Sequence, residues 1–314
     1  MISVVPYTPE LKKQWDIFVE QAKNGLFLFF RDYMDYHADR FVDASLMFYD
    51  GGKLFALLPA SIHDGVLSSH AGLTFGGVLS DERMTVTGML EVFERIVEHA
   101  RTQRLQSFVY KAIPYPFCRL PAQEDLYALF RAGATLIRRD VSSVIKLGTR
   151  LEFSSRRRRG MNKAAKGRLS VSEGGRLESF MPILAHALER HGVKPVHTLA
   201  EIQLLQSRFP RNIRLFSALD TDSEMLAGIL MYEYGRVAHT QYIANSDEGR
   251  KQGALDLIVD HLANHYYPSK ADYLSFGVST EQDGRVLNTG LCTQKEEFGG
   301  RAVAHDFYAV DLTG

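Results

Sequence analysis

The strongest constraint on the fold is that the two halves of this 314-residue chain present the same order of predicted elements. Each half reads as three strands joined by turns, then a loop, an amphipathic helix and a fourth strand. A second helical stretch and a closing strand follow. The first set falls within 45–147 and the second within 213–312. Because the order matches throughout while the residues barely match, the pattern predicts duplication of one α+β unit.

Local patterns support this repeat. Glycine-bearing turns separate the strand-like runs, since glycine accepts the positive φ of tight turns. The central helix of each half has its apolar residues on one face. These residues are Val86, Met89, Leu90, Phe93, Ile96 and Val97 in the first half, and Leu255, Ile258, Val259 and Leu262 in the second. The remaining elements are a strand at 53–62, second helical stretches at 124–132 and 283–297, and closing strands at 141–147 and 302–312.

Composition bounds the function loosely. The formal net charge is +0, so no global attraction to nucleic acid or to an anionic membrane is expected. Cys118 and Cys292 offer neither a disulfide framework nor a CxxC metal motif, which suits a reducing cytoplasm. No signal peptide and no apolar run of about 20 residues is found, so a cytoplasmic location without a transmembrane segment is expected.

A basic stretch follows the first set of elements, and we place a domain boundary there, near Arg150. The predicted domains are therefore 1–150 and 151–314. The stretch 156–168 holds seven cations within thirteen residues. On a helix, these include Arg158, Arg159 and Lys163 as candidate substrate-binding residues, because guanidinium groups suit phosphate. A nucleotide-linked substrate, an acidic lipid head group and a tRNA backbone are the candidate targets, and a solvated linker helix is the plain alternative. No aromatic residue interleaves the cations, so stacking on bases is not indicated.

Three segments carry a resemblance to a known family. They are the basic run RRRGMNKAAK from 157, SDEGRKQGA from 246 and QKEEFGG from 294. Their order resembles the GNAT acetyltransferase superfamily, in its FemAB-like branch with two tandem GNAT-like domains. The resemblance implies two α+β domains, each with a mixed, mostly antiparallel sheet flanked by helices. It also implies an acyltransferase, with acyl-CoA as co-substrate.

The segment Arg250, Lys251, Gln252, Gly253 and Ala254 resembles the loop that binds the coenzyme A pyrophosphate in GNAT enzymes. Consecutive N–H groups at a helix start lack intrahelical partners and attract an anion together with the helix dipole. The next position, Leu255, departs from the Gly/Ala pattern, and a leucine there is expected to crowd a phosphate. A FemAB-like member that has given up coenzyme A would look similar. The first half has no cationic loop of this kind, so it is expected to help shape the acceptor cleft.

Catalytic candidates come from the strands around this loop. Glu233 is a candidate base, and His239 is expected to share a strand face with Gln241 and Ile243. By resemblance, Lys295 stabilises the developing oxyanion and Tyr266 sits where some GNAT enzymes keep a proton-donating tyrosine. Ser279 and Asn288 are candidate substrate-binding residues. No HExxH, GxSxG or paired CxxC motif occurs, so a metal site is not expected.

Three functions remain open from the sequence. The first is an N-acyltransferase that moves an acyl group from acyl-CoA to an amine of a small molecule or peptide, with a nucleotide-linked acceptor among the candidates. The second is FemAB-like aminoacyl or peptidyl transfer in cell-envelope (peptidoglycan) synthesis. The neutral charge and the short span 177–209 disfavour tRNA as its partner. The third is a non-catalytic scaffold that binds an anion.

Overall fold

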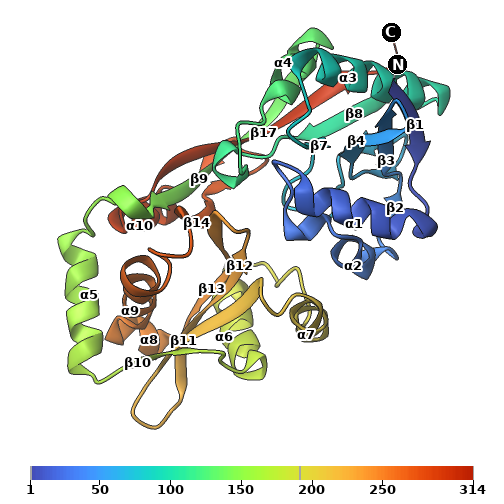
Figure 1. Ribbon diagram of the computed structural model, residues 1–314. Helices are drawn as coiled ribbons and strands as arrows, with labels where there is room; N and C mark the ends of the chain where they lie inside the picture. Colours follow the sequence, from blue (N-terminus) through green and yellow to red (C-terminus); the bar gives the residue numbers. More distant parts are fainter. Residues whose placement is uncertain (1, 191, 314) are drawn as a thin grey trace. The chain divides into compact units, whose positions relative to one another are not determined.

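The computed structural model describes residues 2–190 and 192–313 and divides the chain into two compact units. Unit 1 comprises Met1–Asp140, Gln282–Arg285 and Ala304–Gly314, and unit 2 comprises Val141–Glu281 and Val286–Val303. Helices and mostly antiparallel strands occur in both units, which confirms the predicted α+β class (Figure 1). The expected domain boundary near Arg150 stays a prediction.

Unit 1 holds two small sheets. The strands of the first, in spatial order, are β1 (Ile2–Pro6), β3 (Leu46–Asp50), β4 (Lys53–Leu58) and β7 (Leu79–Ser80). The strands of the second are β17 (Arg301–Asp311), β8 (Ser107–Lys111), β6 (Val66–Ser68), β5 (Ser61–His63) and β2 (Val42–Asp43). The helices are α1 (Lys12–Gln21), α2 (Arg31–Met34), α3 (Val86–Thr102) and α4 (Glu124–Arg131). The predicted apolar face of α3 is buried, because Met89, Phe93 and Ile96 lie in the unit 1 core.

Unit 2 is built on one sheet. Its strands, in spatial order, are β10 (Ser170–Glu173), β11 (Ile213–Leu219), β12 (Met225–Glu233), β13 (Val237–Asn245), β14 (Tyr273–Val278) and β9 (Thr135–Lys146). Its helices are α5 (Ser155–Lys166), α6 (Leu177–Glu189), α7 (Leu199–Arg208), α8 (Asp247–Gln252), α9 (Ala254–His261) and α10 (Thr289–Glu297). The pairing of β13 with β14 is parallel and the other pairings are antiparallel.

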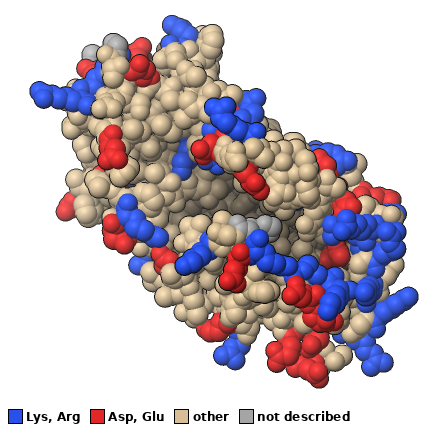
Figure 2. All heavy atoms as spheres, turned by 180° about the vertical axis from the view of Figure 1, so that it is seen from behind, with Lys and Arg blue, Asp and Glu red and all other residues tan. Residues whose placement is uncertain are grey.

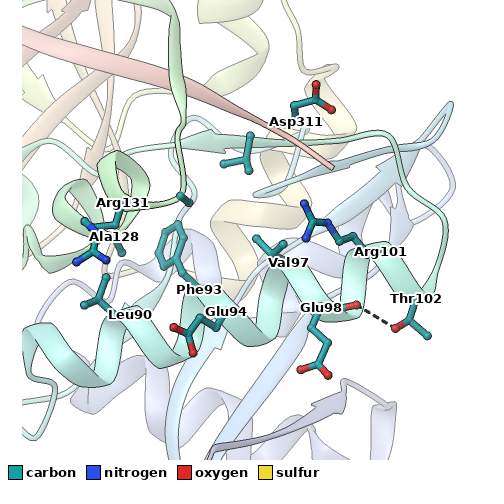
Figure 3. Close-up of a pocket in the computed structure, with 12 residues that line it drawn as sticks. Leu90, Phe93, Glu94, Val97, Glu98, Arg101, Thr102, Ala128, Arg131 and Asp311 are labelled. Atoms are coloured by element: carbon teal, nitrogen blue, oxygen red, sulfur yellow. Dashed lines mark hydrogen bonds between the residues drawn. The ribbon is translucent and has the colours of Figure 1, made fainter. Parts of the chain in front are cut away.

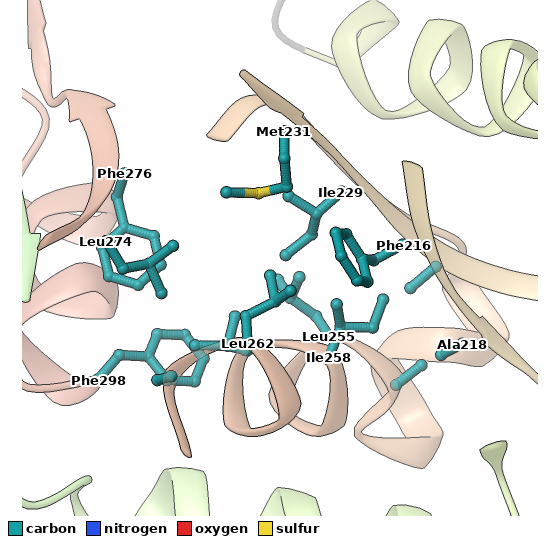
Figure 4. Close-up of a cluster of buried hydrophobic side chains, with 14 of the residues drawn as sticks. Phe216, Ala218, Ile229, Met231, Leu255, Ile258, Leu262, Leu274, Phe276 and Phe298 are labelled. Atoms are coloured by element: carbon teal, nitrogen blue, oxygen red, sulfur yellow. The ribbon is translucent and has the colours of Figure 1, made fainter. Parts of the chain in front are cut away.

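Helices cover both faces of the unit 2 sheet. Helix α9 packs its apolar face on one side, where Phe216, Ile229 and Met231 meet Leu255 and Ile258 (Figure 4). Helix α6 covers the other side, since a Cβ at Gly228 would lie 2.6 Å from Phe180. Central strand β12 is therefore buried on both faces, which explains its continuous apolar run. Helix α7 begins with a capping box, in which the side chains of Thr198 and Glu201 each accept a hydrogen bond from the other residue's backbone N–H group.

The closing strands pair across the repeat. The strand expected at 141–147 was assigned to the first half, yet Ser142–Lys146 of β9 pairs with β14 in unit 2. The strand expected at 302–312 was assigned to the second half, yet Phe307–Asp311 of β17 pairs with β8 in unit 1. Each unit is therefore completed by a strand from the other half of the sequence.

Two further expectations were wrong in detail. The helix expected at 283–297 begins only at Thr289, with Asn288 as its N-cap. The residues before it form a hairpin, β15 (Thr280–Glu281) and β16 (Val286–Leu287), because its turn includes residues at positive φ. The strand expected at 53–62 is two strands in different sheets, β4 and β5.

Candidate functional site

Two neighbouring strands of unit 2 separate halfway along their length. Strands β13 and β14 pair at Val237–His239 and Tyr273–Ser275 and no further. Beyond His239 and Ser275, the backbone N–H and C=O groups of the two strands no longer pair with each other. The separation creates a wedge-shaped opening in the sheet, and such a break in a sheet is a common place for a ligand to bind.

A bulge at this opening corrects one expectation about β13. Met231 pairs with Thr240 and Leu230 pairs with Tyr242, so Gln241 is an extra residue. A bulge reverses the alternation of side chains along a strand. His239 and Ile243 therefore do not share a face. Ile243 packs on the core beneath α9, as Ala238 does, whereas His239 faces the other side of the sheet.

His239 lies at the apex of the opening. Its Nδ1 is 3.0 Å from Ser275 Oγ on the neighbouring strand, within hydrogen-bond distance, and the side chain is buried. The imidazole lies beside Gly277, since a Cβ at that position would be 3.4 Å from His239 Cε1. The positive φ of 70°, and not the space beside the ring, is what favours glycine at 277.

Lys295 lies immediately past the same apex, on α10. Its Nζ donates hydrogen bonds to Gly277 O at 2.9 Å and Val278 O at 2.6 Å. These carbonyls can turn toward α10 because Gly277 has a φ of 70° and the β14–β9 register shifts there. Lys295 is only 4% exposed, and burial lowers the pKa of its ammonium to about 8. An ammonium has three donors, so one remains for a ligand.

A pocket of about 550 Å³ in unit 2 contains Lys295. Its cations come from four helical segments and are Arg156, Arg157, Arg190, Arg250 and Lys295. Its apolar wall includes Ile243, Leu255, Val259, Phe276, Leu291 and Phe298. A single acid, Asp256, lies among the lining residues. We call it the Lys295 pocket, and its charge and apolar wall suit a ligand with an anionic part and an acyl part.

The loop expected to cradle a pyrophosphate is folded differently. Residues 247–252 form helix α8, and its hydrogen bonds use the N–H groups that would face the phosphate. Gly249 N donates to Ser246 Oγ, Arg250 N donates to Ser246 O, and Gly253 N donates to Gly249 O. The N–H groups of Arg250 and Gly253 are therefore used within α8 and at its C-terminal end, and a coenzyme A site at Arg250–Ala254 stays a prediction. Lys251 and Gln252 instead approach Glu248 with their side chains.

The backbone of α5 lies directly against this segment. A Cβ at Gly253 would lie 2.2 Å from Gly160 O, so the two glycines bring α5 and α9 together. The first turn of α9 also carries Asp256, which is paired with Arg157 at 3.0 Å. A carbonyl oxygen and a carboxylate therefore occupy the helix start where an anion was expected. Ala254 is buried at this contact.

Leu255 belongs to the hydrophobic core of unit 2. Its side chain is 7% exposed and packs in the core under α9, beside Ile258 (Figure 4). It forms part of the apolar wall of the Lys295 pocket instead of crowding a phosphate.

Arg157 connects the helices around the pocket. Its guanidinium pairs with Asp256 of α9 and, at 2.6 Å, with Glu297 of α10. It also lies 4.7 Å from the ring centroid of Phe298. Since its side chain is 12% exposed, these contacts fix α5, α9 and α10 to one another.

Two predicted catalytic residues lie elsewhere. Glu233 accepts a hydrogen bond from Tyr267 Oη at 2.8 Å and pairs with Arg214 at 3.2 Å, and it does not line the Lys295 pocket. Burial raises the pKa of its carboxyl. Tyr266 donates to Glu173 at 3.0 Å and is likewise outside the pocket. Neither is placed to act on a ligand beside Lys295.

The predicted substrate-binding residues divide into two groups. Ser279 follows the carbonyls that bind Lys295, and its buried Oγ has no hydrogen-bond partner among the described residues. Asn288 caps α10 and donates to Glu281. Arg158 binds Glu152 and Phe153 O, while Arg159 and Lys163 are exposed on α5. Figure 2 shows Lys and Arg side chains gathered on the side of the molecule that carries α5, at the right of that view.

A second pocket, of about 640 Å³, lies in unit 1 between α3, α4 and the end of β17 (Figure 3). Phe93, Val97 and Val310 line its floor, and acids and bases alternate around it. It contains none of the predicted site residues. No lysine or histidine lines it, so the Lys295 pocket is the better candidate for acyl-transfer chemistry.

The sequence of unit 2 matches a known domain family. Residues 151–283 match the acetyltransferase (GNAT) domain. The fold is that of the GNAT superfamily. Residues 151–283 thus form an acyltransferase-type domain, and the enzyme class expected from the sequence is confirmed at this level.

Solved structures with the same fold cover nearly the whole chain. FemX is 12% identical with a TM-score of 0.70, over 98% of this chain and 97% of that one. L-PGS from Bacillus licheniformis is 12% identical with a TM-score of 0.62, over 98% and 93%. A tandem GNAT protein from the clavulanic acid biosynthesis pathway is 12% identical with a TM-score of 0.53, over 100% and 99%. The tandem GNAT-like fold with FemX-like relatives is thereby confirmed. No curated protein sequence gives a significant match.

Within 2–190 and 192–313, no helix combines the length and apolarity that crossing a membrane requires. Over the same residues, no group of three or more His, Cys, Asp or Glu side chains is arranged to hold a metal ion.

Two residues that line the pocket, and one acid that contacts its arginines, were not predicted from the sequence. Arg156 belongs to the basic stretch but was not selected, and Arg190 follows α6 with no motif around it. Asp247 was read as part of a loop, yet it contacts both Arg190 and Arg250. The only available signal was Ser246, whose role as N-cap of α8 could have shown that a helix starts there.

Proposed function

We propose that this chain transfers an acyl or aminoacyl group from an activated donor to an amine at the Lys295 pocket. The observation that carries the proposal is Lys295 itself, a buried ammonium at the point where β13 and β14 separate, with one donor left for a ligand. Lys295 is the residue that the FemAB-like resemblance assigned to the oxyanion.

The chemistry needs little covalent help from the protein. The amine nitrogen attacks the donor carbonyl carbon, and a tetrahedral intermediate with an anionic oxygen forms. Its collapse makes the amide bond and breaks the bond to the donor, which leaves with a proton. The Lys295 ammonium stabilises the negative oxygen, and a low-dielectric surrounding strengthens this interaction.

His239 is our candidate for the group that takes the proton from the amine. It lies at the apex of the opening, next to Gly277, whose carbonyl binds Lys295. Ser275 fixes the ring orientation through Nδ1. His239 does not line the Lys295 pocket, but it lies against Gly277, the residue of β14 whose carbonyl binds Lys295, so the two side chains approach one segment of β14.

Two donors are candidates, and one observation separates them. Acyl-CoA is the usual donor of GNAT enzymes, but here the N–H groups of the pyrophosphate loop are used inside α8, and Gly160 O covers the helix start. This arrangement favours aminoacyl-tRNA, with FemX as the relative of matching fold. Acyl-CoA stays a candidate if side chains bind its phosphates.

Binding measurements test the donor. We expect aminoacyl-tRNA to be retained by the protein, while acetyl-CoA shows no heat of binding at millimolar concentration in titration calorimetry. An Arg158→Ala, Arg159→Ala variant should retain less tRNA, because both side chains lie on the exposed basic helix. Two results together would identify acyl-CoA as the donor. They are tight binding of acetyl-CoA and equal retention of tRNA by the wild type and the variant.

The pH dependence of kcat tests the role of Lys295. Burial lowers the pKa of this ammonium to about 8, so the stabilising charge is present below that pH and is lost above it. Above the pKa of Lys295, we expect kcat to fall about tenfold for each pH unit, once the uncatalysed rate is subtracted. A kcat that stays constant from pH 8 to pH 10 would rule out a charged Lys295 as the oxyanion group.

A further inference from the structure

We propose that Arg190 and Arg250, with Arg156 on the α5 side of the same pocket, form a side-chain clamp for a phosphate group of the acyl donor. The proposal rests on the function proposed above and names how the donor is held. It replaces the main-chain cradle, which the fold of α8 does not provide.

The two central arginines come from different elements and meet at one carboxylate. Arg190 follows α6 and Arg250 lies on α8. Arg190 Nη1 is 3.6 Å from Asp247 Oδ1, and Arg250 Nη2 donates to the same oxygen atom. Arg250 is also fixed by a hydrogen bond of 2.7 Å to Asn245 O. Both guanidinium groups therefore lie side by side at the pocket.

This pair carries more positive than negative charge. Asp247 is the one carboxylate that the two arginines share, and its other neighbour is His186, at 3.7 Å. Burial and then the nearby charge of Arg190 lower the pKa of Arg250. Two guanidinium groups that repel each other gain from a bound anion, and planar guanidinium forks match the oxygens of a phosphate.

The third arginine, Arg156, adds charge from α5. Arg156 lines the same pocket, is 71% exposed and reaches only 3.8 Å to Glu297. Its side chain is thus weakly held and available to a ligand. Arg157 differs, because Asp256 and Glu297 already use its guanidinium.

Asp247 has a defined part in the clamp. Its carboxylate is 67% exposed and neutralises Arg190 and Arg250 when no ligand is bound. An incoming phosphate must displace it. Removing its charge should therefore strengthen anion binding, a result that damage to the fold would not produce.

Calorimetry with inorganic pyrophosphate tests the clamp at low salt. We expect Arg190→Met and Arg250→Met each to weaken pyrophosphate binding about tenfold, as for the loss of a charge-assisted contact. Asp247→Asn should bind pyrophosphate several-fold more tightly than the wild type. Arg211→Met, which removes an exposed arginine of unit 2 outside the pocket, should leave binding unchanged. Wild-type affinity in both clamp variants, or weaker binding in Asp247→Asn, would overturn the proposal.

Two ligands distinguish the source of the phosphate. Desulfo-coenzyme A carries a diphosphate, and a short RNA ending in CCA carries phosphodiesters. The clamp predicts that the Arg250→Met variant loses affinity for whichever of the two the wild type binds. If neither binds the wild type, the clamp is wrong.

The clamp and the proposed reaction can fail separately. Lys295→Met should lose transfer activity, while its pyrophosphate binding should weaken less than that of Arg190→Met or Arg250→Met. Intact activity in Lys295→Met with lost binding in the arginine variants would refute the reaction and keep the clamp. Lost activity in Lys295→Met with wild-type pyrophosphate binding in the arginine variants would refute the clamp and keep the reaction.

Discussion

Replacing Lys295 with methionine is expected to lower kcat for acyl transfer by about 10²- to 10³-fold, as for the removal of one oxyanion donor. Methionine is unbranched and only one heavy atom shorter than lysine, but it supplies no charge and no donor. The oxyanion would then lose its cation, and Gly277 O and Val278 O would lose the hydrogen bonds that Lys295 donates. The measurement is the rate of donor deacylation in the presence of an amine acceptor.

Lys146→Met is the matched control. Lys146 is an exposed lysine at the end of β9 in the same unit and does not line the pocket. Its replacement should leave kcat unchanged. Far-ultraviolet circular dichroism and urea denaturation show whether Lys295→Met is folded. A folded Lys295→Met with the activity of Lys146→Met would remove Lys295 from the reaction.

Replacing Gly253 with alanine is expected to lower the free energy of unfolding by about 3 kcal/mol, through two effects. The residue has a φ of 76°, which costs a side chain about 1 kcal/mol. The new Cβ would also lie 2.2 Å from Gly160 O, so α5 must move away from α9. Urea denaturation measures the change.

Gly235→Ala separates these two effects. Gly235 has the same φ of 76°, yet nothing lies within 4 Å of a Cβ built on it. We expect this variant to lose only about 1 kcal/mol, the cost of the backbone conformation alone. Equal losses in the two variants would show that the contact between α5 and α9 is not tight in solution. Because α5 carries Arg156, the Gly253 variant should also weaken pyrophosphate binding.

The order of strand-like runs and turns, and the helical spacing of apolar residues, predicted much of the fold. Helices α3 and α9 have the predicted apolar faces, since a periodicity of 3.6 residues reports which side of a helix is buried. Lys295 was identified from its segment, and the structure places it in a pocket beside β14. These features depend on residues close together in the chain, so local patterns carry them.

The failures concern contacts that local patterns do not record. The bulge at Gln241 moved His239 to the other face of the sheet from Ile243. The segment Arg250–Gly253 matched a phosphate loop by residue type, yet Ser246 caps a helix there and the N–H groups are used. Glu233 looked available at a strand end, but Tyr267 and Arg214 approach it from other elements.

The sequence by itself determined the α+β class, the repeated order of elements and the chemical type of the candidate site. Only the tertiary structure decided which strand completes each sheet and which cations share a pocket. Strands β9 and β17 carry no signal for their partners, because pairing depends on register and packing between residues far apart in the chain. Arg190 and Arg250 stand 60 positions apart in the numbering and meet at Asp247 only because α6 and α8 pack near each other. The physical reason is the same in both cases, since long-range contacts leave no periodic trace in the sequence.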